Sequence, residues 1–208
     1  MARISAMLPV MLFSGLLASM PVPATEVGVT AGDWAQLERG DVAARTEMTR
    51  NAAGEDTGRG VALAIVEAPA TRVMDTVWAY ERHPEFMPRV ERMDVLAGED
   101  APIHKRVAVT LGVLWKRVRY TLDVRRDAER NEIRWALDKA AAHDIVDTTG
   151  VWRFVPLGAA RTLVAYEVRI DTGIAVPRAL QEFFTQRDLP GLLAAVKKRI
   201  ESGDTWRK

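Results

Sequence analysis

The fold is indicated most clearly by nine residues in the middle of the chain, Arg117-Val-Arg-Tyr-Thr-Leu-Asp-Val-Arg125. Apolar residues alternate here with charged or polar ones from Val118 to Val124. A period of two is typical of a β-strand with one face on a core and the other in water. Strands of a parallel sheet are buried on both faces and read as continuous apolar runs, so the alternation predicts an antiparallel sheet.

The same alternation recurs on both sides of this strand. The polar links at residues 127–131 and 158–161 are short enough for hairpins. The sequence therefore predicts an antiparallel meander, whose further strands contain residues 61–65, 107–111, 133–137 and 164–170.

Two short helical segments are expected in the first half of the chain. Residues 31–40 read as a short helix or turn. Pro69 is expected to open a second helix, because proline is tolerated in a first turn and apolar residues recur at helical spacing as far as Tyr80. His83-Pro84 is expected to end this helix.

The C-terminal part of the chain supplies a cover for the apolar face of the sheet. A helical pattern starts at Pro177, Pro190 interrupts its backbone hydrogen bonds, and Gly203 can cap its end. The pattern predicts a long, kinked amphipathic helix, whose apolar stripe contains Leu180, Phe183, Phe184, Leu189, Leu192, Leu193, Val196 and Ile200.

The first 24 residues have the layout of a secretion signal. Arg3 precedes an apolar stretch at residues 6–18, and Val22-Pro-Ala24 places small residues at the last and third-last positions before a cleavage site. A membrane anchor needs about 18 to 20 apolar residues, whereas Pro9 and Gly15 interrupt a shorter run. We therefore expect cleavage after Ala24 and an exported, periplasmic protein.

Composition limits the function classes. The chain has 29 Lys+Arg against 28 Asp+Glu, a formal net charge of +1, so long-range attraction to nucleic acid has little to act on. It contains no cysteine, which excludes disulfides and thiolate chemistry. Without residues 1–24, about 185 residues remain, a usual size for one domain.

One segment carries a family resemblance. Ile65-Val-Glu-Ala-Pro-Ala70 leads into Val73-Met-Asp-Thr-Val-Trp78 and then Tyr80-Glu-Arg-His-Pro-Glu-Phe-Met-Pro-Arg-Val90. Together with Gly150-Val-Trp-Arg-Phe-Val-Pro-Leu157, this order resembles START-like (SRPBCC) domains of the polyketide cyclase/dehydrase and coenzyme Q-binding (Coq10-like) type. The resemblance spans residues 40–202; residues 138–147 and the segment around Trp34 lie outside it.

The resemblance implies an α+β helix-grip (START/Bet v 1-like) fold, in which a curved antiparallel sheet packs on a long C-terminal helix and encloses an apolar cavity. It suggests lipids, isoprenoid quinones, sterol-like molecules or aromatic polyketides as ligands. The expected organisation is a signal peptide (residues 1–24), an N-terminal extension (25–39), a START-like domain (40–203) and a C-terminal tail (204–208). The family shares no single catalytic constellation, so no catalytic residue is carried over.

Aromatic side chains on the predicted buried faces are the candidates for a ligand cavity. Their indole N–H and phenol groups could orient a bound apolar molecule. The alternative is that they simply fill the core. The candidates are Trp78, Tyr120, Trp135, Trp152, Phe154, Tyr166, Phe183 and Phe184.

The sequence offers no metal or cofactor site. His83, His104 and His143 are far apart in the chain and read as surface or turn histidines, although His143 is a candidate polar group at a cavity mouth. No cysteine or Gly-x-Ser-x-Gly elbow is present, so nucleophilic catalysis is unsupported.

Three functions remain open. The first is an exported carrier or sensor of an apolar small molecule. The second is a cyclase- or dehydratase-like enzyme that uses the same cavity, with Tyr120, Glu85 or His143 moving protons. The third is a membrane- or protein-interaction domain that acts through basic residues between Lys105 and Arg119. No obligate protein partner is evident, and the identity of the ligand stays open.

Overall fold

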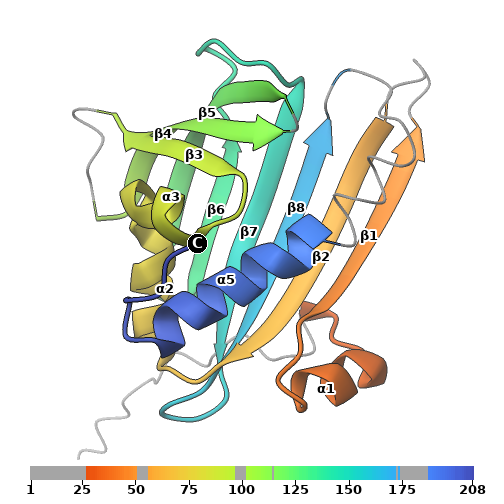
Figure 1. Cartoon of the computed structure of the whole chain (residues 1–208), viewed down its shortest axis with the longest axis vertical. Helices are drawn as coiled ribbons and strands as arrows, with labels where there is room; N and C mark the ends of the chain where they lie inside the picture. The colour runs from red at the N-terminus through yellow and green to blue at the C-terminus, as the bar shows by residue number, and fades with distance from the viewer. Residues whose placement is uncertain (1–26, 51–55, 97–101, 114, 172, 174–186) are drawn as a thin grey trace, which may run out of the picture.

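The computed structural model describes residues 27–50, 56–96, 102–113, 115–171, 173 and 187–208. One antiparallel sheet runs through it in the order β1-β2-β8-β7-β6-β5-β4-β3 (Figure 1). The strands are β1 (Ala43–Arg50), β2 (Asp56–Val66), β3 (Val90–Val95), β4 (His104–Val113), β5 (Lys116–Asp127), β6 (Glu132–Leu137), β7 (Asp147–Pro156) and β8 (Thr162–Asp171). The helices are α1 (Ala31–Leu37), α2 (Ala70–Trp78), α3 (His83–Phe86) and α5 (Leu189–Glu201), with a 3-10 turn η2 (Tyr80–Arg82).

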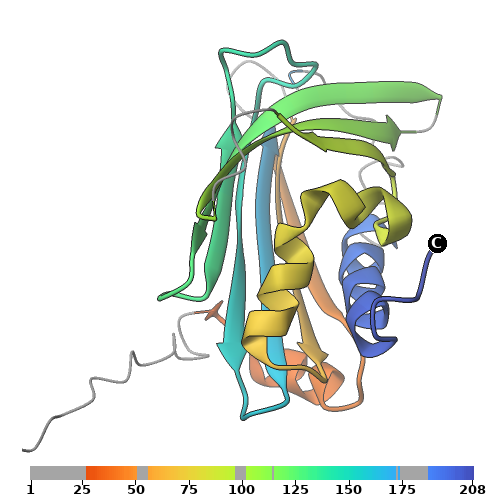
Figure 2. The ribbon, with the colours of Figure 1, turned by 90° about the vertical axis from the view of Figure 1, so that its left-hand side faces the viewer.

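The sheet curves around the C-terminal helix. Helix α5 crosses its concave face, and α2, η2 and α3 close one side of the same face (Figures 1 and 2). Every pair of neighbouring strands is antiparallel. The predicted α+β fold, a curved antiparallel sheet packed on a C-terminal helix, is confirmed.

Small residues on β2 let α5 approach the sheet closely. Ala62 and Ala64 are fully buried on the concave face, and a Cβ on Gly60 would meet a methyl carbon of Leu189 at 3.0 Å. The larger residues between them, Leu63 and Ile65, face the opposite side. The alternation in β2 is therefore between two buried faces, with the small residues toward the helix.

The convex face is covered locally by α1, which the sequence did not link to the domain. Thr30 and Asp33 form a reciprocal capping box at its start, and Arg45 of β1 forms an ion pair with Asp33. A second core cluster lies between α1 and the sheet: Val27, Leu37, Ala43, Leu63, Ile65, Val155, Leu163 and Ala165. The sequence predicted that each strand exposes one face to water. This is wrong for β2, because α1 of the N-terminal extension covers its convex face.

The helix after Pro69 ends earlier than predicted. Helix α2 stops at Trp78, and a separate short helix, α3, begins at His83 with Pro84 in its first turn. His83-Pro84 therefore starts a helix and does not end one. Proline suits this position because it has no N–H to leave unpaired and its φ is already helical.

The C-terminal helix ends as its sequence predicts. Gly203 has a φ of +68°, and its N–H donates to Ile200 O while that of Asp204 donates to Arg199 O. This pair of bonds is the Schellman motif, which satisfies carbonyls that the helix leaves open. Pro190 lies in the first turn of α5; the predicted start at Pro177 lies outside the described residues. Among the described helices, none is long and apolar enough to cross a membrane.

A buried arginine joins α5 to α3 and to the C-terminal tail. Arg199 is 1% exposed, and its guanidinium donates to Glu85 Oε2 at 2.7 Å and to Trp206 O at 2.8 Å. The cation also lies 5.5 Å from the ring centre of Phe86. The tail adds further bonds, since Lys208 Nζ donates to Met87 O and to Val90 O.

We expect Arg199→Met to lower the free energy of unfolding by about 3 kcal/mol, because it removes one partner of a buried charged pair. Arg207→Met is the control, since Arg207 contacts the same Glu85 carboxylate at 3.1 Å from an exposed position and should contribute little. Urea denaturation followed by circular dichroism measures both. Equal losses in the two variants would contradict the proposed role of Arg199.

Candidate functional site

Stacked aromatic rings line the concave face beneath α5. Trp135 of β6 and Tyr166 of β8 stack with ring centres 5.3 Å apart, and Trp152 of β7 lies 4.5 Å from Tyr166. Phe154 continues the row, with its ring parallel to Trp152 at 6.5 Å. Alternation places Trp152 and Phe154 on one face of β7, with Arg153 between them on the other face. Trp135 and Tyr166 pack in the same core cluster from the neighbouring strands.

A glycine makes room for the largest ring. Gly150 of β7 pairs with Trp135 in the sheet, and a Cβ on Gly150 would fall 2.0 Å from an atom of the indole. The indole therefore lies against the backbone of β7 at Gly150. Any side chain at position 150 would displace Trp135.

Three tyrosines belong to this core. Burial raises the pKa of Tyr80, Tyr120 and Tyr166 well above that of an ordinary phenol. Charge repulsion from Tyr166 adds to the rise at Tyr80, and repulsion from Tyr120 adds to the rise at Tyr166. Within the part of the chain that the structure describes, none of the three hydroxyls has a hydrogen-bond partner. The phenols stay neutral at physiological pH and can still donate to a guest molecule.

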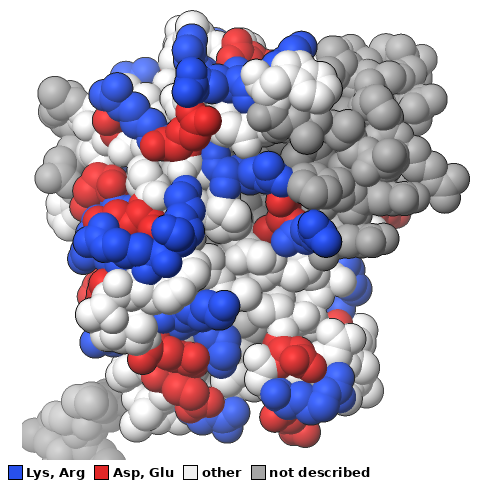
Figure 3. Space-filling view, viewed as in Figure 1, with Lys and Arg blue, Asp and Glu red and all other residues white. Residues whose placement is uncertain are grey.

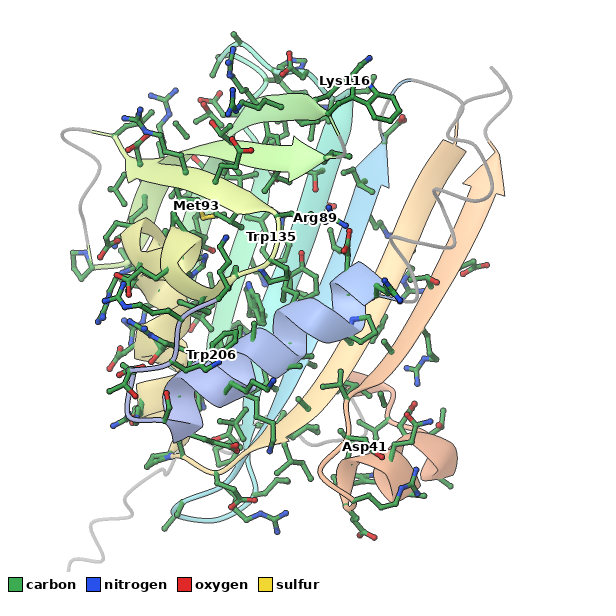
Figure 4. The ribbon with its side chains drawn as sticks, in the orientation of Figure 1. Asp41, Arg89, Met93, Lys116, Trp135 and Trp206 are labelled. Atoms are coloured by element: carbon green, nitrogen blue, oxygen red, sulfur yellow. The ribbon has the colours of Figure 1, made fainter. Side chains whose placement is uncertain are left out.

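The rim of the concave face is apolar and only half-buried. Met93 of β3 is partly buried against the same core as Trp135, and both are labelled with Arg89 in Figure 4. Arg89 Nε lies 3.2 Å from Asp188 Oδ1 at the start of α5. This ion pair connects the turn before β3 to α5. Burial raises the pKa of Asp188 although Arg89 opposes this rise. The other half-buried apolar residues on this side are Val95, Leu111, Val168 and Leu192.

The backbone at Arg89 is constrained. Its φ is +62°, a conformation that non-glycine residues rarely adopt. Its carbonyl accepts from the Gly112 N–H at 2.8 Å, which holds the turn against β4. Strain of this kind persists where the surroundings fix it, often beside ligand sites.

The predicted cavity residues are only partly brought together. Tyr120, Trp135, Trp152, Phe154 and Tyr166 share the concave face. Trp78 lies at the end of α2, in edge contact with Tyr80 at 6.2 Å, and Lys105 Nζ sits 5.0 Å from its ring centre. Phe183 and Phe184 lie outside the described residues. Sequence reasoning did not propose Tyr80, Arg89 or Asp188, because each reaches the site from a different loop or helix end.

The polar candidates for proton transfer point elsewhere. Desolvation disfavours the charge on Glu85, but Arg82, Arg207 and Arg199 together hold the pKa of its carboxyl below the usual range. His143 is exposed, and its Nδ1 lies 2.7 Å from Ile145 O. Among the candidates named for proton transfer, only Tyr120 faces the interior.

His83 is buried, whereas the sequence predicted a surface or turn histidine. It is 1% exposed, with Nε2 donating to Val77 O at 2.9 Å and rings of Tyr80 and Phe86 on either side. Burial, with a smaller contribution from Lys105, lowers its pKa to about 4. The imidazole is therefore neutral in the folded protein.

Two hollows lie on the described surface, and the second of them includes Trp135 and Gly150 in its lining. One of about 350 Å³ sits between α2 and the end of α5, beside Arg72, Phe86 and Arg199. The other, of about 340 Å³, lies on the strands β6, β7 and β8 among Arg134, Arg153 and Glu167. In the described part of the chain, no three His, Cys, Asp or Glu side chains group as a metal site would require.

Comparison with known proteins identifies the family. Residues 66–197 match the model of the family described as polyketide cyclase/dehydrase and lipid transport. The chain belongs to this family. The match starts at the last residue of β2 and ends within α5, so it includes the strands β3 to β8, which carry Tyr120, Trp135, Trp152, Phe154 and Tyr166. No curated protein matches the sequence significantly.

Solved structures share the fold at low identity. A START superfamily protein from Mycobacterium smegmatis is similar at a TM-score of 0.56 and 18% identity, over 78% of this chain and 99% of that one. The Zhui aromatase/cyclase from Streptomyces sp. R1128 is similar at a TM-score of 0.55 and 19% identity, over 77% of this chain and 98% of that one. A STAR-related lipid transfer protein from Xanthomonas axonopodis is similar at a TM-score of 0.56 and 16% identity, over 75% of this chain and 98% of that one. These likenesses establish the helix-grip fold.

The neutral state of His83 predicts acid sensitivity. Its folded pKa of about 4 lies below the unfolded value of about 6.5, so the unfolded chain binds the proton first. Stability from this residue is complete above pH 6.5 and falls by about 3 kcal/mol as the pH drops to 4. Denaturant titrations at several pH values should show this slope.

His83→Gln keeps a donor for Val77 O and removes the titration, so its stability should vary less between pH 6.5 and 4. The control is His143→Gln, at an exposed histidine, which should keep the wild-type slope. A His83→Gln slope as steep as that of the wild type would show that other groups cause the acid sensitivity.

Proposed function

We propose that this protein is an exported carrier or sensor that holds an apolar small molecule, such as a lipid, a quinone or a polyketide-like compound, between the concave face of the sheet and α5. The family and fold support a domain that binds hydrophobic ligands. The observation that carries the proposal is the row of stacked rings with three inward phenols that have no partner within the described residues.

The chemistry of the phenols favours holding a ligand over transforming it. A phenol whose pKa is raised remains protonated, so it can donate a hydrogen bond to a carbonyl or hydroxyl but is a poor general base. The aromatic faces supply apolar contact, and the phenols supply the few polar groups that orient a guest. The Arg89–Asp188 pair adds a charged boundary at the rim.

A cyclase- or dehydratase-like activity is the second candidate, because the fold is shared with an aromatase/cyclase. In this chain it would depend on Tyr80, Tyr120 or Tyr166 as a proton donor. Glu85 and His143 are turned away from the rings. Conversion of an offered polyketide would favour the enzyme over the carrier; dehydration is seen as the loss of water in the mass, and cyclisation without dehydration as a new chromatographic peak of unchanged mass.

The binding site is tested by filling it. Leu111→Trp adds bulk on the concave face, and Thr110→Trp places the same bulk on the other face of the same strand. The probe is N-phenyl-1-naphthylamine, an apolar dye whose fluorescence rises in apolar surroundings. We expect Leu111→Trp to weaken dye binding about tenfold, a loss of about 1.4 kcal/mol, and Thr110→Trp to leave it unchanged.

The natural ligand is sought by organic extraction and native mass spectrometry of the protein as purified. A co-purified apolar molecule that is missing from Leu111→Trp supports the proposal. Absence of both a co-purified molecule and dye binding in the wild type would refute it.

Export is tested separately. We expect expression of the full chain in a Gram-negative host to give periplasmic protein whose first residue is Thr25, because Val22-Pro-Ala24 has the small residues of a cleavage site. Cell fractionation and N-terminal sequencing measure this. Uncleaved protein that stays in the cytoplasm would refute export without affecting the ligand proposal.

A further inference from the structure

The tip of the β4–β5 hairpin carries the most exposed large apolar side chain among the described residues. Trp115 is 82% exposed, ahead of Ile103 at 64% and Val146 at 49%. An indole normally buries a large area on folding, so its exposure at a tip needs an explanation in terms of something that covers it.

Basic residues follow the tryptophan directly. Lys116, Arg117 and Arg119 are all exposed, and only Arg117 is engaged, with Glu91 at 2.6 Å, among side chains in the described structure. Lys116 marks this upper end of the molecule (Figure 4), where Lys and Arg side chains, together with Asp and Glu, lie beside an uncharged patch (Figure 3).

The other basic pair of the hairpin, Lys105 and Arg106, does not contribute to the basic surface at the tip. Lys105 and Arg106 lie at the far end of β4 from the tip. Lys105 is buried and donates to Trp78 O, and Arg106 forms an ion pair with Asp138. The basic surface that the sequence suggested between residues 105 and 119 is thus divided, and its outward cations gather beside Trp115.

The hairpin projects from the rest of the molecule. Figure 2 shows β4 and β5 extending past the sheet on the side that holds α5. Leu111 and Tyr120, on the concave face of these two strands, belong to the candidate ligand site. The tip therefore stands at one end of the wall that the proposed ligand would contact.

We propose that the hairpin tip, Trp115 with Lys116, Arg117 and Arg119, docks the protein on an anionic lipid bilayer. An indole has an apolar body and a polar N–H and prefers the membrane–water interface, and neighbouring cations are attracted to anionic head groups. A protein partner would need a broad patch of about 800 Å² on each side. The tip offers one ring at the end of a two-stranded projection, which suits point insertion into a bilayer.

The experiment uses the full mature chain and sedimentation with sucrose-loaded vesicles at about 0.15 M salt. One vesicle preparation is phosphatidylcholine alone, and the other adds phosphatidylglycerol. We expect binding to the anionic vesicles only. Trp115→Ser should lower it about tenfold, and Lys116→Glu several-fold.

Ile103→Ser is the matched control, because Ile103 is exposed but precedes β4 at the end away from the tip. It should bind vesicles as the wild type does. Equal binding by the wild type and Trp115→Ser, or no binding of the wild type to anionic vesicles, would overturn the proposal. Dye binding in solution should survive Trp115→Ser, so failure of docking and failure of the ligand proposal are distinguishable.

Discussion

The close packing of α5 on the concave face is the contact on which the rest of the structure depends. Gly60, Ala62 and Ala64 of β2 leave space for it, and the buried guanidinium of Arg199 ties its last turns to α3 and to the tail. A buried cation is tolerable only with its partners in place. The position of α5, and with it the width of the interior, is therefore held by a charged anchor at one end.

The opposite end of the same interior is less completely buried. Around Arg89, Leu111, Tyr166 and Leu192 the side chains are only half-buried, and the phenols there lack partners within the described residues. Between the two ends, Trp135 lies against Gly150 and stacks on Tyr166. The molecule thus combines a closed, ion-paired end with an aromatic end that has unused hydrogen-bonding capacity.

Part of the candidate site follows from strand periodicity. Tyr120, Trp135, Trp152, Phe154 and Tyr166 were identified because residues two apart on a strand share a face. Tyr80, Arg89 and Asp188 were not, since nothing local in the sequence relates a turn after α2, a turn before β3 and the start of α5. His83, predicted as a surface or turn histidine, is buried because the short segment that carries it, with Tyr80 and Phe86, packs on the core of the sheet.

The sequence by itself determined the antiparallel sheet, the helix cap at Gly203 and the family, because alternation, glycine geometry and short motifs are properties of neighbouring residues. Only the tertiary structure decided that α1 covers the convex face, that Lys105 turns inward while Trp115 stays in water, and that Tyr80, Tyr120 and Tyr166 share one core. These outcomes depend on which strands become neighbours and how strongly the sheet curves, and both are set by contacts between residues far apart in the chain.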